Sequence, residues 1–459
     1  MALLTAGLLL VLRSSENEYG TYLYQAGVLA GKSERTAAVA AYREAARLRP
    51  HDPHPHLELA RVYLGWGRCD EALSAISDAE RLGAEAASVE RLRVLVHAQS
   101  AESAKTEKLS HWEAVVEHAG RVLDLEPDDR ETERALARAH LGLREWDAAC
   151  ALYADLIRSD PQDSTLRERL GALLLGDDPA ALKHLAIAAT DLSDQLLTGF
   201  LESTDVDDSA YVHARLGRIL IEHQEWALAA RHLERGVQLR PDYAEAQAHL
   251  GHALDRMGYR DEARAHLLEA TELAPTAPLG HTFLGLHYER WDDTAAARDA
   301  YETAYDLAPD NAAICTEIGQ TWAAEGRYGA AEIWLKEAVS LEPGDPALWE
   351  ALAWFYLNHN IASNDRAIEA TERLLELAPD SALAHDLRGW AAFQSGLYEG
   401  AEPYLQRAIE LDAESASAYY HLGLLRKVQG QTGEAERAFR RAMDLDTTGD
   451  LASLIERVY

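Results

Sequence analysis

Cysteine is scarce in this sequence. The three cysteines, Cys69, Cys150 and Cys315, lie far apart, and none belongs to a C-x-x-C pair. Neither a disulfide framework nor a zinc site follows from this spacing. Three reduced thiols fit a reducing compartment, so we expect a cytoplasmic protein.

Positive charge is also in short supply. The chain has 44 basic and 77 acidic residues, which gives a net charge of −33. A phosphate backbone needs a basic face, so we expect no nucleic-acid partner. Docking on an anionic membrane is disfavoured for the same reason. The acidity either keeps a long surface soluble or matches a basic partner.

The apolar run that opens the chain, MALLTAGLLLVL at residues 1–12, is too short to span a bilayer, which takes about 20 residues. It has the length of a signal-peptide core but lacks a basic start and a clear cleavage site. We interpret residues 1–18 as a helix that caps the fold. The alternative is an imperfect signal or membrane anchor, which would make the protein exported or membrane-anchored.

Catalytic signatures are missing too. The sequence contains no G-x-x-x-x-G-K-[ST], no G-x-G-x-x-G after a strand, no H-E-x-x-H and no G-x-S-x-G. HDPHPH at 51–56 and the pair His249 and His252 lack further ligands at metal spacing. We therefore predict a protein that is not an enzyme and that holds no metal or cofactor.

What the sequence does have is a period. Pro241, Pro275, Pro309 and Pro343 follow one another at steps of 34 residues. A constant period in this range is typical of a solenoid built from stacked repeats.

Each period contains two amphipathic helices. In residues 244–275, Gly258 separates the two helices and Pro275 ends the second. The small residues Gly251 and Ala263 let the two backbones approach closely. A leucine at Gly251 is therefore predicted to overpack the contact.

The recurring pattern resembles the tetratricopeptide repeat. It is clearest within residues 281–309, at Leu284, Gly285, Tyr288, Ala297, Tyr301, Ala304 and Pro309. The resemblance covers about twelve repeats between residues 19 and 449. It implies an all-α fold, a right-handed α-α superhelical solenoid of helix-turn-helix repeats.

The repeats divide the chain into parts. We predict an N-terminal array at 19–190, an acidic joint at 191–209, a C-terminal array at 210–449 and a capping helix at 450–459. One repeat of the first array carries an insertion, AESAKTEKLS at 101–110.

The resemblance also implies a function: a non-catalytic scaffold that binds a partner protein or peptide in the concave groove lined by the first helix of each repeat. Arginine suits a carboxylate-bearing ligand, and exposed aromatic residues suit interface anchors. The alternatives are surface ion pairs and packing between repeats. The candidate ligand-binding residues are Arg138, Arg215, Arg218, His249, His252, Phe283, Trp354, Trp390, Phe393 and Tyr420.

Two other functions stay open: an accessory or regulatory subunit of a separately encoded enzyme, and a membrane-tethered assembly factor if residues 1–12 act as an anchor. Some proteins of this family bind chaperone tails through a carboxylate clamp of Lys and Asn residues in the groove. No repeat of this chain offers both a Lys and an Asn on its first helix, so a chaperone-tail adaptor is disfavoured. The sequence leaves the partner's identity and the oligomeric state open.

Overall fold

The computed structural model describes residues 18–203, 208–359 and 365–458, and their regular structure is entirely α-helical. The prediction for residues 1–18 falls almost wholly outside this part of the chain. Residues 18–31 are helical. Within the described ranges, every helix is either too short or too polar to cross a membrane.

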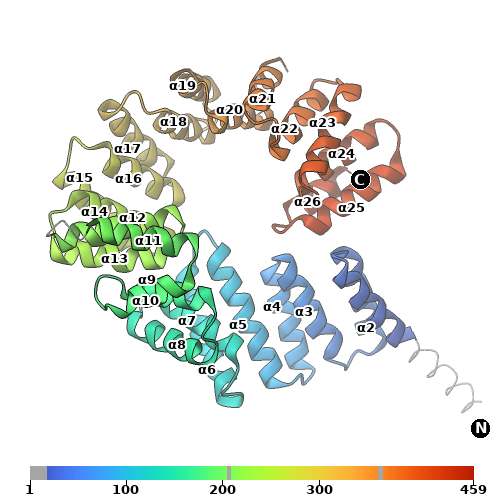
Figure 1. The fold of residues 1–459 in the computed structure, drawn as a ribbon. Helices are drawn as coiled ribbons and strands as arrows, with labels where there is room; N and C mark the ends of the chain where they lie inside the picture. Colours follow the sequence, from blue (N-terminus) through green and yellow to red (C-terminus); the bar gives the residue numbers. More distant parts are fainter. Residues whose placement is uncertain (1–17, 204–207, 360–364, 459) are drawn as a thin grey trace, which may run out of the picture. The chain divides into compact units, whose positions relative to one another are not determined.

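The helices follow one another along the chain, from blue to red in Figure 1. In the first half they are α2 (Arg35–Leu48), α3 (His54–Trp66), α4 (Cys69–Arg81), α5 (Ala86–Ser103), α6 (Lys108–Leu125), α7 (Arg130–Gly142), α8 (Trp146–Ser159), α9 (Ser164–Leu174), α10 (Ala180–Ala188), α11 (Asp191–Ser203), α12 (Ser209–Glu222) and α13 (Trp226–Leu239). In the second half they are α14 (Ala244–Met257), α15 (Arg260–Leu273), α16 (Pro278–Arg290), α17 (Thr294–Leu307), α18 (Ala312–Ala324), α19 (Tyr328–Leu341), α20 (Pro346–His359), α21 (Asp365–Leu377), α22 (Ala382–Gln394), α23 (Tyr398–Leu411), α24 (Ala416–Val428), α25 (Thr432–Leu445) and α26 (Asp450–Val458).

The helices group into two compact units. Unit 1 consists of Met1–Leu92 together with Glu332–Tyr459, and unit 2 is Arg93–Ala331. The predicted arrays at 19–190 and 210–449 and the acidic joint at 191–209 stay predictions. Part of that stretch is a regular helix, α11, whose Leu192 and Leu196 are buried in the core of unit 2.

Helices pack in pairs, as the period predicts. The closest pairs include α12 with α13, α14 with α15, and α16 with α17 in unit 2, and α22 with α23 and α24 with α25 in unit 1. The first helices of successive pairs also contact one another, as α12, α14 and α16 do in unit 2 and α20, α22 and α24 do in unit 1. This confirms the all-α repeat fold, and it places the first helices of neighbouring repeats on a shared surface.

Helix ends carry local signals. Gly258 closes α14 in the left-handed region, with φ of +94°, where a residue without Cβ is unstrained. Asn311 caps α18, because its side chain accepts hydrogen bonds from the backbone N–H groups of Ala313 and Ile314. Gly258 therefore ends the first helix of its repeat, and Asn311 begins the first helix of the next but one.

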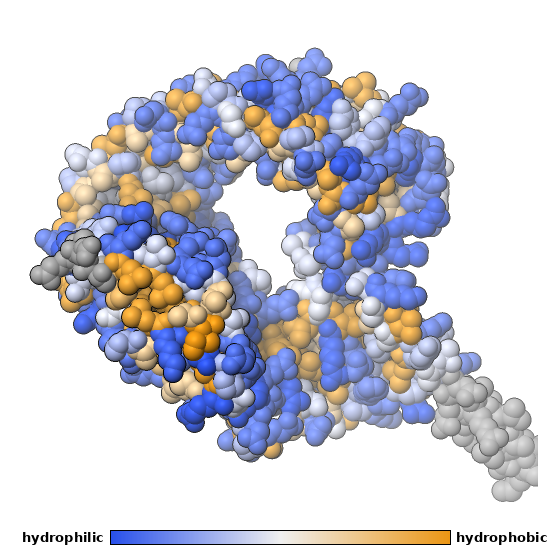
Figure 2. Space-filling view, viewed as in Figure 1, coloured by the Kyte–Doolittle hydropathy of each residue, from blue (hydrophilic) through white to orange (hydrophobic). Residues whose placement is uncertain are grey.

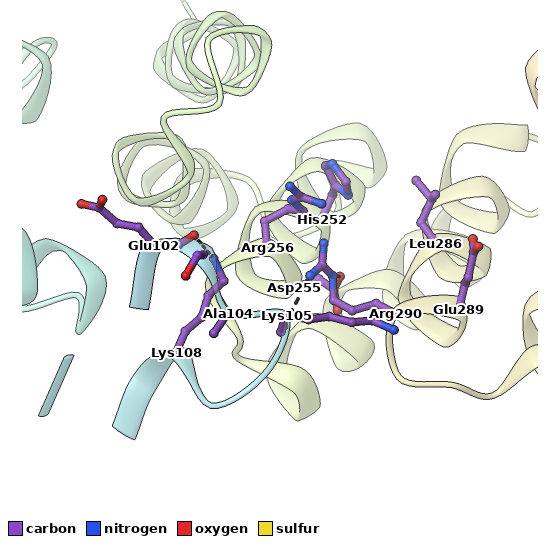
Figure 3. Close-up of a pocket in the computed structure, with 11 residues that line it drawn as sticks. Glu102, Ala104, Lys105, Lys108, His252, Asp255, Arg256, Leu286, Glu289 and Arg290 are labelled. Atoms are coloured by element: carbon purple, nitrogen blue, oxygen red, sulfur yellow. Dashed lines mark hydrogen bonds and ion pairs between the residues drawn. The ribbon is translucent and has the colours of Figure 1, made fainter. Parts of the chain in front are cut away.

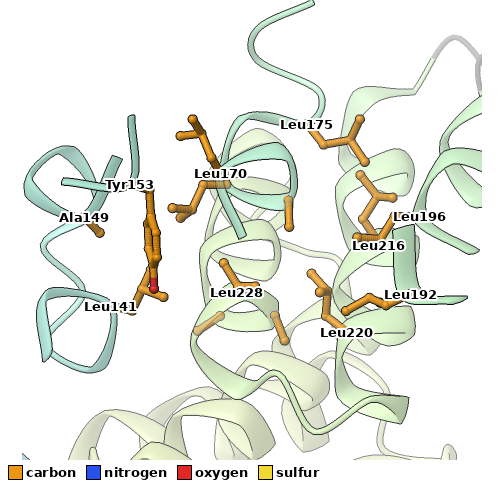
Figure 4. Packing of buried hydrophobic residues seen from close by; sticks show 14 of the residues in the cluster. Leu141, Ala149, Tyr153, Leu170, Leu175, Leu192, Leu196, Leu216, Leu220 and Leu228 are labelled. Atoms are coloured by element: carbon orange, nitrogen blue, oxygen red, sulfur yellow. The ribbon is translucent and has the colours of Figure 1, made fainter. Parts of the chain in front are cut away.

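The largest hydrophobic cluster of unit 2 extends across several repeats, from α7 to α15. Figure 4 shows Tyr153 and Leu170 facing leucines of later helices, among them Leu220 and Leu228. No single helix pair could bury this apolar surface alone, so each repeat depends on its neighbours. The face shown in Figure 2 is mainly hydrophilic, with scattered hydrophobic patches, as expected for a net charge of −33.

A glycine lies at the closest approach of several helix pairs. A Cβ built on Gly251 would lie 2.6 Å from Cγ of Leu267 and 2.9 Å from the backbone oxygen of Ala263. The same clash would occur at five other pairs: Gly171 with Leu185, Gly217 with Leu233, Gly285 with Tyr301, Gly389 with Leu405 and Gly423 with Phe439. A large side chain of the second helix therefore occupies the space that the missing Cβ leaves.

Gly251→Leu should destabilise the fold by roughly 1–3 kcal/mol, because the new side chain must displace Leu267 or the α15 backbone. Urea unfolding followed by circular dichroism would measure the loss. Gly120→Leu on α6 is the matched control: a Cβ at Gly120 meets no atom within 4 Å, and leucine favours helix over glycine. An unfolding midpoint for Gly251→Leu equal to that of the wild type would contradict this packing.

Candidate functional site

The insertion at 101–110 forms a bridge inside unit 2. Residues 104–107, here called the bridging turn, join α5 to α6 and lie against α14 and α16 (Figure 3). Nζ of Lys105 lies 3.1 Å from Oδ1 of Asp292, and the guanidinium of Arg290 donates to the backbone oxygen of Lys105 at 3.5 Å. A cavity of about 480 Å³ lies between the two sides. Its volume is in the range of ligand-binding pockets.

Asp255 is the buried anion of this pocket. Its Oδ1 accepts hydrogen bonds from Nδ1 of His287 at 2.7 Å and from Nε1 of Trp291 at 2.9 Å. Its Oδ2 pairs with Nε of Arg290 at 2.7 Å. These three donors belong to α16 and its end, so one carboxylate of α14 ties two neighbouring first helices together.

Two cations of the pocket have no such partner. Nζ of Lys108 donates to the backbone oxygen of Glu102 at 3.2 Å, and the guanidinium of Arg256 lies 5.0 Å from the ring centre of Trp226. Neither cation forms an ion pair with a carboxylate of the described chain. Burial and the nearby arginines Arg256 and Arg290 lower the pKa of Lys108, and burial and Arg290 lower that of Arg256.

The three arginines predicted to bind a ligand already have partners. Each pairs with a glutamate of the chain: Arg138 with Glu102 at 2.7 Å, Arg215 with Glu202, and Arg218 with Glu245 at 3.0 Å. A carboxylate ligand would have to displace these glutamates, and ligand binding by these residues stays a prediction.

The predicted residues His249, His252 and Phe283 come together on α14 and α16. His252 stacks on Phe283 with ring centres 4.5 Å apart, and His249 meets the same ring edge-on at 5.4 Å. Burial lowers the pKa of both histidines to about 4, so both rings are neutral at pH 7. They contribute aromatic surface beside the pocket, not positive charge.

The remaining aromatic candidates lie in unit 1. Trp390 of α22 stacks on Phe393 with ring centres 5.1 Å apart and on His421 of α24 at 4.2 Å. The ring centre of Tyr420 lies 6.0 Å from the ring centre of Phe439, which belongs to the second helix α25. These candidates, with Trp354 on α20, are only partly buried. Part of this aromatic surface thus packs between repeats, and part stays accessible to a ligand.

Sequence reasoning missed Lys108 and Arg256. One signal pointed to the first: two of the six lysines of the chain lie in the insertion at 101–110. Nothing in the sequence near Arg256 indicated that this arginine would face the insertion, because the two residues meet only in the fold.

A metal site does not assemble at HDPHPH, or elsewhere in the parts of the chain that are described, from three or more His, Cys, Asp or Glu side chains. Cys69, Cys150 and Cys315 are free thiols, and Cys315 is buried.

Family models of the tetratricopeptide repeat match residues 244–276, 292–355, 362–416 and 387–450. Among curated proteins, the chain is 23% identical to the human Cell division cycle protein 16 homolog over 202 residues, 42% of this chain and 33% of that protein. It is 23% identical to the human Protein O-mannosyl-transferase TMTC1 over 206 residues, 44% of this chain and 23% of that protein.

A shorter match, 36% identical over 92 residues, links the chain to mouse Superkiller complex protein 3, covering 19% of this chain and 6% of that protein. The chain thus spans about a third or less of the length of these relatives. Among solved structures, a chain of the APC/C hetero-tetramer Cut9-Hcn1 aligns over 96% of both chains, with 15% identity and a TM-score of 0.42.

Asp255→Ala should lower the free energy of unfolding by about 3–5 kcal/mol, since it leaves Arg290 and the donors of α16 buried without their anion. Chemical denaturation would measure the loss. Asp155→Ala is the control, because Asp155 pairs with Arg158 at the surface of α8 and its loss should change stability by less than about 0.5 kcal/mol. Equal stability of the two variants would show that Asp255 does not hold α14 to α16.

Stability should fall as the pH drops from about 6.5 towards about 4. In this window the unfolded state binds protons at His252 that the folded state does not, because burial lowers the folded pKa. Asp255 opposes this shift, whereas Arg256, Arg290 and His249 add to it.

His252→Gln should therefore lose less stability between pH 7 and pH 4.5 than the wild type does. Melting temperatures at half-unit pH steps would test this. His51→Gln, at an exposed position, is the matched control and should keep the wild-type slope. The same slope in His252→Gln would mean that His252 is not held neutral by the fold.

Proposed function

The chain is a tetratricopeptide-repeat protein, and we propose that it is a non-catalytic scaffold whose first helices bind a segment of a partner protein. The observation that carries the proposal is the aromatic surface of His249, His252 and Phe283 beside the pocket of unit 2. Partly buried aromatic residues on a shared helical surface are typical anchors for a peptide or a helix.

The first helices of unit 1 offer a second surface of the same kind. Trp354, Trp390, Phe393 and Tyr420 lie on α20, α22 and α24. The ring of Trp390 stacks on His421, and Nδ1 of His421 lies 2.8 Å from Oδ1 of the buried Asp386. A ring fixed in this way loses little conformational freedom on binding, which favours its use as an anchor.

The relatives favour a role inside a larger assembly. One of them is named an anaphase-promoting complex subunit, with 22% identity over 195 residues. A second candidate role, an accessory subunit of a separately encoded enzyme, is favoured by the similarity to the O-mannosyl-transferase TMTC1. A cytoplasmic location belongs to the same proposal and is supported by the three free thiols.

Affinity capture from the native host's lysate, with bound proteins identified by mass spectrometry, would test the proposal. The wild type is compared with Phe283→Ala in unit 2, Trp390→Ala in unit 1 and the control Ile333→Ala. Ile333 is 70% exposed on the second helix α19, so its truncation should leave capture unchanged. For a partner that binds through one surface, loss of the matching ring should weaken binding at least about tenfold, or about 1.4 kcal/mol.

Circular dichroism would first establish that each variant is folded. If all three variants captured the same proteins as the wild type, the first helices would not be the binding surface. Loss in Ile333→Ala alone would move the interface to the second helices.

A further inference from the structure

We propose that the pocket under the bridging turn binds an oxyanion, a carboxylate or a phosphate group, held between Lys108 and Arg256. The proposal does not depend on the aromatic surface binding a protein. A free anion and an anionic side chain of a partner would use the same two cations.

The carboxylates that line the pocket already form ion pairs or hydrogen bonds with other groups. Glu102 pairs with Arg138 at 2.7 Å, and Asp255 pairs with Arg290 at 2.7 Å. Glu289 accepts a hydrogen bond from the hydroxyl of Tyr301 at 3.0 Å. None of the three forms an ion pair with Lys108 or Arg256. Glu102 attracts Lys108 and Asp255 attracts Arg256 without coming within ion-pair distance, and repulsion and burial outweigh this attraction.

The two cations are held where an unpaired charge is unfavourable. Burial and repulsion from Arg256 and Arg290 lower the pKa of Lys108, and burial together with Arg290 lowers that of Arg256. A bound anion would raise both pKa values, because it would attract both Lys108 and Arg256 in a partly desolvated site.

The geometry of the two groups also suits an oxyanion. The indole of Trp226 supports the guanidinium of Arg256, and the planar fork of guanidinium matches carboxylate and phosphate oxygens. Lys108 is the first residue of α6, where the helix dipole favours negative charge. Figure 3 shows Lys108 on the side of the bridging turn and Arg256 on α14.

An anion between them would link the two sides of the pocket. Without it, the main contacts of the bridging turn are the pair of Lys105 with Asp292, two largely exposed side chains, and the long hydrogen bond from Arg290. Exposed pairs contribute about 0–1 kcal/mol. Binding of the anion should therefore restrain the bridging turn.

The test uses the full-length protein at pH 7 with sodium phosphate, sodium succinate or sodium chloride at matched ionic strength. Isothermal titration measures affinity, and hydrogen–deuterium exchange measures protection of residues 102–110. We expect saturable binding of phosphate, succinate or both, with slower exchange in this segment. Binding of phosphate alone would identify the ligand group as a phosphate, and binding of both would identify a general oxyanion site.

Lys108→Gln and Arg256→Gln should each weaken binding by about tenfold or more. The matched controls Lys183→Gln and Arg158→Gln, at exposed positions of unit 2, should bind as the wild type does. Because Lys108→Gln removes repulsion, its melting temperature without anion should be no lower than that of the wild type, which separates lost binding from lost folding. No effect of phosphate or succinate beyond that of chloride, or equal losses in the controls, would overturn the proposal.

Discussion

The rest of the structure depends on the contact between a glycine of one helix and a large side chain of the next. Where Gly251 lies under Leu267, the missing Cβ allows two backbones to approach and one side chain to fill the gap. The contact recurs at Gly217, Gly285, Gly389 and Gly423. The pairs that share this contact have a similar internal geometry, so their apolar faces can stack on those of neighbouring pairs.

Stacking then dictates where a ligand could bind. Second helices use their small and large residues for the contact within a pair, and first helices also contact the first helices of neighbouring pairs. Side chains of the first helices that are not used in these packing contacts remain available to a ligand. In unit 2 they include the stacked rings of His252 and Phe283, and in unit 1 the stacked rings of Trp390 and His421. Within each unit, repetition of the packing thus produces a surface shared by neighbouring first helices.

The bridging turn adds something that repetition alone does not provide. Ordinary repeats contact only their neighbours, but this turn brings Lys105 within hydrogen-bonding distance of Asp292, which is 187 residues away in the chain. The pocket that results has walls from distant repeats. It contains a buried carboxylate, Asp255, whose interactions are internal to the fold. It also contains the cations Lys108 and Arg256, which form no ion pair with a carboxylate of the described residues.

The sequence by itself determined the repeat. The proline spacing, Gly258 at a helix end and the glycine at 251 predicted helix pairs and their contact, because such signals act within a few residues or within one period. It also identified the aromatic candidates on the first helices. It did not reveal that the side chains of Arg138, Arg215 and Arg218 pair with glutamates from outside their own helices.

Only the tertiary structure decided the electrostatics of the site. The neutral state of His249 and His252 results from burial against rings of another repeat, which no local pattern expresses. The meeting of Lys108 with Arg256 depends on how an insertion folds across repeats far along the chain. Charge balance and burial are set by all the groups around a side chain, and most of those groups are distant in sequence.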